Sequence, residues 1–141
     1  MAAILSLKAW GPNIWDRMLL VYGLLAWLVF MITAVANGIF RVSQLQLMLS
    51  EYGAHLLSTL LLCLALLIEM SIFLELVGDY SPNWFIALGV MWMLLTLGFE
   101  FGFGRLMGQS WATLLENYDV LHGRIWPLVP LILLLTPILA G

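Results

Sequence analysis

The carboxylate of Glu100 lies within an apolar run, TLGFEFGFGR at residues 96–105, where three phenylalanines enclose it. A carboxylate stays ionised beside an opposite charge, whereas one left alone in apolar surroundings takes up a proton. We therefore expect an arginine to form an ion pair with Glu100, with Arg41 as the first choice and Arg124 as the second. The pair would be either a structural lock between two helices or part of a functional site.

A second carboxylate, Glu69, falls near the middle of another apolar run, where burial of a charge costs most. At about 100° per residue it shares a helix face with His55, Ser58 and Thr59, so we expect it to point into a bundle and away from lipid. It is either a proton-carrying or ion-binding group, or a protonated carboxyl that is hydrogen-bonded to a neighbouring helix. Its candidate partners are Thr33, Tyr22 and Trp92.

Composition places these carboxylates in a membrane protein. The chain has 141 residues, one domain's worth, and is 64% hydrophobic and 9% charged, whereas soluble domains carry about 25% charged residues. So few charges do not cover a water-exposed surface, which predicts an integral membrane protein in contact with lipid. The net charge of −3 and the lack of a basic run exclude nucleic acid as an expected partner.

Four apolar runs approach the roughly 20 residues that a helix needs to cross a bilayer. The sequence therefore predicts an all-α fold in which residues 1–141 form one domain, an antiparallel bundle of four transmembrane helices. A turn over 78–83 would make the second and third spans a hairpin, and residues 41–54 would form a longer polar link. The residues before the first span would form an interfacial arm. The predicted spans are 14–40, 55–77, 84–103 and 125–140.

Polar residues gather at one predicted end of this bundle. Arg41 ends the first span, His55 begins the second, Glu100 ends the third and Arg124 begins the fourth, so alternating helix directions bring all four to one membrane face. We expect a charged mouth there. The predicted ligand- or ion-binding residues are Asn37, Arg41, His55, Ser58, Glu69, Glu100, Arg105, Asp119 and Arg124.

A metal site at the mouth has weak support. His55, His122 and Glu100 have the ligand types that zinc or iron accepts, but no pair of them has a diagnostic spacing. We predict neither a metal nor a cofactor, and no catalytic residues.

The link over 104–124 is too long for a plain connection between helices. Ser110 and Gly123 have the residue types that begin and end a helix, so we expect a short interfacial helix, with Trp111 as its membrane anchor. Gly98 and Gly102 form a small face that permits close helix contact, either within the bundle or, less favoured, between copies.

Several stretches resemble a group of small uncharacterised bacterial four-helix inner-membrane proteins. The resemblance covers residues 37–128 and implies the same four-span layout, but no activity. The stretches are NGIFR at 37–41, HLLST at 55–59, FEFGFGR at 99–105, GQSWATLLENYD at 108–119 and GRIWPL at 123–128.

Three functions remain open at this point. The first is a bundle that binds or conducts a proton, an ion or a small ligand at the mouth, with Glu69 as a relay, and that forms a homo-oligomer. The alternative is a non-catalytic accessory or assembly subunit of a larger membrane complex. The least supported is an intramembrane enzyme that uses Glu100, His55 and Asp119 as acid–base groups. We expect a bacterial inner-membrane location, with both termini cytoplasmic.

Overall fold

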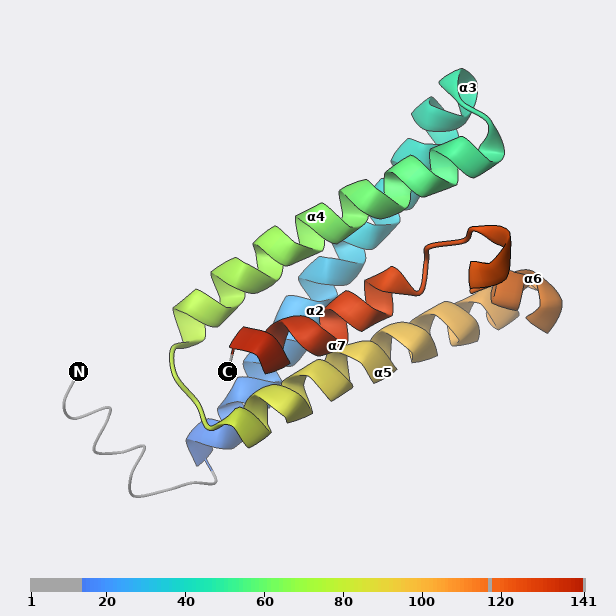
Figure 1. Ribbon diagram of the computed structural model, residues 1–141. Helices are drawn as coiled ribbons and strands as arrows, with labels where there is room; N and C mark the ends of the chain where they lie inside the picture. Colours follow the sequence, from blue (N-terminus) through green and yellow to red (C-terminus); the bar gives the residue numbers. More distant parts are fainter. Residues whose placement is uncertain (1–13, 117, 141) are drawn as a thin grey trace.

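The computed structural model describes residues 14–116 and 118–140, and over these residues the chain is helical, with no strand (Figure 1). For residues 14–16 and His122 only the backbone is described. The predicted N-terminal arm lies outside the described residues. The elements are α2 (Ile14–Phe40), η1 (Arg41–Leu45), α3 (Gln46–Met48), α4 (Glu51–Val77), α5 (Pro82–Leu106), α6 (Trp111–Glu116), η2 (Val120–His122) and α7 (Leu128–Ala140).

Three helical segments in the described chain are long and apolar enough to cross a membrane: Arg17–Met48, α4 and α5. The last apolar helix, α7, has only 13 residues. At 1.5 Å per residue it is about 20 Å long, less than the roughly 30 Å hydrocarbon core. Its length therefore distinguishes α7 from the three other predicted spans.

The polar link predicted over 41–54 is wrong, because the first helix continues through it. Residues Arg41–Leu45 form a π-helical turn and α3 follows directly, so the connection to α4 is only Leu49 and Ser50. Leucine, glutamine and methionine are strong helix formers and fill this segment. The Ser50 side chain then accepts a hydrogen bond of 3.0 Å from the Gly53 N–H and begins α4.

The four main helices form a ring in the order α2, α4, α7, α5. The turn predicted between α4 and α5 is confirmed, since Gly78 ends α4 with a φ of +78° and Pro82 begins α5. However, α4 and α5 do not pack together as the predicted hairpin. In Figure 1, α7 lies between them, and each of the two packs against α7 and against α2.

Trp92 joins α5 to its neighbours in the centre of the bundle. Its side chain is fully buried, and its ring lies edge-on to Phe30 of α2 and Phe73 of α4. Its indole N–H donates a hydrogen bond of 2.8 Å to the backbone oxygen of Gly23. A buried indole needs such an acceptor, so this bond fixes the position of α5 against α2.

Gly89 brings α5 and α7 into close contact. A Cβ atom at this position would lie 2.3 Å from the backbone oxygen of Leu134, so only glycine permits this approach. Gly98 and Gly102, which were expected to form a contact within the bundle, do not: a Cβ at either would meet nothing within 4 Å among the described residues. The close contact is therefore made two turns earlier on the same helix.

We predict that Gly89→Ala lowers the thermal midpoint of the purified protein. The added methyl group meets a backbone carbonyl that cannot move alone, and overpacking of this kind costs about 1–3 kcal/mol. Gly98→Ala is the matched control, because the same change on the same helix has open space around it. Size-exclusion chromatography after heating in detergent measures both midpoints, and equal values would contradict the α5–α7 contact.

Candidate functional site

A cavity of about 320 Å³ lies around the start of α7. Residues of α2, η1, α4, α5, α6 and the first turn of α7 line it, together with residues of the connections on either side of α6. Its apolar lining is Met31, Ala34, Val35, Leu62, Leu66, Phe99, Phe101, Phe103, Gly104, Leu114 and Val129. Its polar lining is Arg41, His55, Thr96, Glu100, Gln109, Tyr118 and Trp126.

The Glu100 carboxylate accepts hydrogen bonds from two aromatic side chains. The Tyr118 hydroxyl donates to Oε2, and the Trp126 indole N–H donates to Oε1. The predicted pairing of Glu100 with Arg41 or Arg124 is wrong, since no ion pair joins Glu100 to any arginine that the structure describes. The reason is the late start of α7, which lets the preceding connection fold into the bundle and bring both donors to the carboxylate.

Tyr118 is held in place by stacking. Its ring lies 5.6 Å from that of Phe101, which also stacks at 6.1 Å against Trp111 of α6. Burial and the nearby Glu100 carboxylate raise the pKa of Tyr118 above its ordinary value. The hydroxyl therefore keeps its proton and remains a donor at physiological pH.

Arg41 and His55 complete the polar part of the cavity. The His55 ring lies 5.7 Å from the Trp126 ring. Within the part of the chain that the structure describes, neither the Arg41 guanidinium nor the His55 imidazole has a hydrogen bond to another side chain. Both side chains line the cavity, so their donors remain available to a ligand.

Several of the predicted site residues lie outside the cavity. The hydroxyls of Ser58 and Thr59 donate to the backbone oxygen of His55, at 3.4 and 2.7 Å, so they satisfy their own helix. Glu69 lies between α4 and α2, where its Oε1 accepts a hydrogen bond of 2.5 Å from Thr33, one of its three candidate partners. Its Oε2 is buried and has no hydrogen-bond partner among the described residues.

The charged residues of the connections have other contacts. Arg105 lies over the Trp111 ring at 5.1 Å and donates to the Gln109 backbone oxygen. Arg124 forms an ion pair of 3.5 Å with Glu116 and also lies over the Tyr52 ring. Asn37 is half-buried on α2 and Asp119 is half-buried before η2, and neither is part of the cavity lining. Of the nine predicted residues, Arg41, His55 and Glu100 line the cavity.

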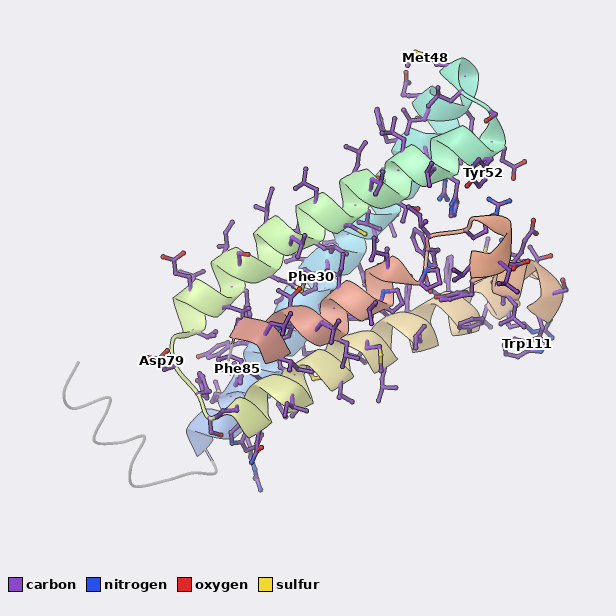
Figure 2. The ribbon with its side chains drawn as sticks, viewed as in Figure 1. Phe30, Met48, Tyr52, Asp79, Phe85 and Trp111 are labelled. Carbon is purple, nitrogen blue, oxygen red and sulfur yellow. The ribbon has the colours of Figure 1, made fainter. Side chains whose placement is uncertain are left out.

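The connection after α5 contains α6, which begins as predicted but does not extend to Gly123, since Tyr118 and Asp119 lie outside it. Ser110 begins this helix by accepting a hydrogen bond of 3.2 Å from the Thr113 N–H, as predicted. Leu114 is buried against Gly104. A Cβ atom added to Gly104 would lie 2.4 Å from Cδ2 of Leu114. Gly123 ends the turn η2 with a φ of +82°, and its backbone oxygen accepts a hydrogen bond of 2.9 Å from Tyr52 of α4 (Figure 2).

Trp111 points away from the bundle in Figure 2, with 55% of its surface exposed. Its anchoring in a membrane interface stays a prediction. No group of three metal-ligating side chains is present among the described residues, and the side chain of His122 lies outside them.

Tyr118 and Trp126 were not predicted from the sequence as partners of Glu100. Both were visible as aromatic residues with a polar hydrogen near the predicted mouth, and such groups seek an acceptor when buried. They were not considered because a positively charged side chain was expected to pair with the Glu100 carboxylate.

The fold and the cavity define an all-helical protein with three helices that have the length and composition of membrane spans. Comparisons with protein-family models, with curated proteins and with solved structures find no match to this chain. The resemblance to small bacterial inner-membrane proteins stays a prediction that these comparisons do not test.

We predict that Tyr118→Phe destabilises the protein, because it removes one of the two donors to Glu100. Hydrogen bonds to charged groups contribute about 1.5–3 kcal/mol. Tyr22→Phe is the control, since Tyr22 is exposed and has no hydrogen bond to another described residue. Thermal unfolding in detergent should show a lower midpoint for Tyr118→Phe alone, and a smaller effect of the same change in a Glu100→Gln background. An unchanged midpoint would show that the hydroxyl is dispensable.

Proposed function

We propose that this is a small multi-pass membrane protein that binds a small ligand in the cavity at one end of its bundle. The observation that carries the proposal is the distribution of polar groups around that cavity. Arg41 and His55 offer donors that no described side chain uses, while Met31, Leu62 and Leu66 make its deeper wall apolar. Small-molecule sites typically combine a mostly apolar lining with a few convergent polar groups in a volume of about 300–1,000 Å³.

The proposed membrane arrangement has three full crossings and a shorter fourth helix. Arg17–Met48, α4 and α5 cross the bilayer, and α7 enters from the cavity end and packs between α4 and α5. We place the protein in the bacterial inner membrane with both termini in the cytoplasm. In Figure 1, α2 begins and α7 ends at the same end of the bundle, opposite α3 and α6, which supports placing both termini on one side.

C-terminal fusions test the proposed orientation. A green fluorescent protein fused after residue 141 should fluoresce, and alkaline phosphatase at the same position should be inactive, because the C-terminus is cytoplasmic. The same two reporters inserted at residue 108, in the connection between α5 and α6, should give the opposite results. Active phosphatase at the C-terminus would reverse the proposed orientation without affecting the cavity.

Binding has more support than conduction in this chain. Glu69 was expected to relay protons below the mouth, but it does not line the cavity, and its hydrogen bond to Thr33 joins α4 to α2. We therefore assign the binding role to Arg41, His55 and Glu100. Glu100 acts chiefly by holding Tyr118 and Trp126 in the cavity wall.

Filling the apolar wall should displace the ligand. We predict that Leu66→Phe reduces the amount of a small molecule that co-purifies with the protein by about tenfold, because overpacking a small cavity costs on the order of 1–3 kcal/mol. Leu67→Phe is the matched control, since Leu67 is the next residue on α4 but is exposed and does not line the cavity. Glu69→Gln should also leave the bound amount unchanged. Native mass spectrometry after gentle detergent extraction measures the bound mass in each variant.

The same preparations test the alternative, an accessory subunit of a membrane complex. Wild-type protein that carries no small molecule but co-purifies with a fixed set of other chains would contradict the binding proposal and favour that alternative. Equal bound mass in the Leu66→Phe and Leu67→Phe proteins would show that the molecule lies outside this cavity.

A further inference from the structure

Three residues that line the cavity are also exposed on the outside of the bundle. Val35 of α2 and Phe99 and Phe103 of α5 line the cavity, and yet 51%, 37% and 52% of their surfaces are exposed on the outside of the bundle. A side chain that lines a cavity and also reaches the outer surface belongs to its rim. The rim therefore lies between α2 and α5, within segments that have the length and composition of membrane spans.

The cavity also changes in character along the bundle axis. Its lining on the first helix runs from Met31 of α2 to Arg41 at the start of η1, and its lining on α4 runs from Leu66 to His55. Ten or eleven residues of helix correspond to about 15 Å. Over that distance the lining changes from apolar side chains to a guanidinium and an imidazole, so the cavity is an elongated slot with one polar end.

The polar end favours an acid group. Glu100 has both of its oxygens engaged by Tyr118 and Trp126, whereas Arg41 makes no ion pair within 4.0 Å with any residue that the structure describes. A guanidinium presents a planar set of donors that matches a carboxylate or a phosphate. The His55 imidazole lines the same end and can form a further hydrogen bond there.

We propose that the ligand is a membrane amphiphile with a single acyl chain and an acidic head group, which enters sideways from the bilayer between α2 and α5. This inference rests on the proposed binding function and names its ligand class. The acyl chain lies along Met31, Leu62 and Leu66, and the acid group contacts Arg41 and His55. Entry through the rim keeps the chain in an apolar environment throughout and avoids its transfer through water.

Photolabelling with lipid probes tests this ligand class. The protein is reconstituted into phosphatidylcholine nanodiscs and titrated with a diazirine-bearing palmitic acid, its methyl ester, or a lysophosphatidic acid with the same chain, and labelled residues are mapped by mass spectrometry. We expect the acid to label Met31 or Leu66 with an apparent affinity about tenfold higher than that of the ester, as for a charge-assisted hydrogen bond. The carboxylate and phosphate probes then show which acid the site prefers.

Variants connect the labelling to the proposed contacts. Arg41→Gln should remove the difference between acid and ester, and Arg41→Lys should retain part of it, which also controls for a folding defect. Val35→Trp should block the rim and reduce labelling of Leu66, whereas Ile32→Trp should label like wild type, because Ile32 lies on the same helix with 70% exposure but does not line the cavity.

Two results would overturn this inference. One is equal labelling of the cavity by acid and ester in the wild-type protein, and the other is labelling of Leu66 that Val35→Trp leaves unchanged. With a co-purifying molecule that Leu66→Phe displaces, the first result would reject the acidic amphiphile and the second would reject its entry between α2 and α5, and both would leave the binding function standing. Absence of any co-purifying molecule and of any cavity labelling would reject both.

Discussion

The length of α7 is the constraint on which the cavity end of the molecule depends. This helix has 13 residues, whereas the neighbours that it separates, α4 and α5, have 27 and 25. At 1.5 Å per residue it spans about half of their length. Beyond its first residue, Leu128, no fourth helix is present to fill the ring, and a folded connection takes its place. The aromatic side chains of that connection fill the space only in part, which is why a cavity remains.

The same arrangement explains how a carboxylate is accommodated among phenylalanines. An ion pair buried there would require the desolvation of two charged groups, and that cost often exceeds the attraction gained. Glu100 instead receives two neutral donors, Tyr118 and Trp126, so only one charge is desolvated. The stacking of Tyr118 on Phe101 positions the first donor. Arg41 makes no ion pair within 4.0 Å with a described residue, which is the basis of the proposed ligand chemistry.

The sequence predicted where the helices lie along the chain better than it predicted which helices pack against each other. Composition alone indicated the three long apolar helices that have the length of membrane spans. The segment after Phe40 was mistaken for a link because its polar residues were weighted above its helix-forming ones. Helix periodicity identified the faces that carry His55, Thr96 and Glu100, but a periodic pattern states which face is buried and not which helix covers it.

The partners of Glu100 could not be derived for the same reason. They lie 18 and 26 residues further along the chain, in a connection whose path depends on where α7 begins. The last span was predicted to begin at residue 125, whereas α7 begins at Leu128, and nothing in the local sequence predicts that Trp126 lies before the helix and inside the bundle. The contact between Gly89 and Leu134 also joins residues far apart in the chain, and no residue spacing predicts it.

The place of α7 in the ring has a consequence for the order in which the molecule is assembled. Chains form structure from the N-terminus onward during synthesis, and α7 is made after the two helices that it separates. Helices α4 and α5 are joined by a short turn and are both complete before α7 exists, yet they must not close on each other, because the last helix belongs between them. The nascent protein therefore carries an open slot between α4 and α5 until residues 128–140 have been made. A chain interrupted shortly before residue 128 would lack the helix that fills this slot.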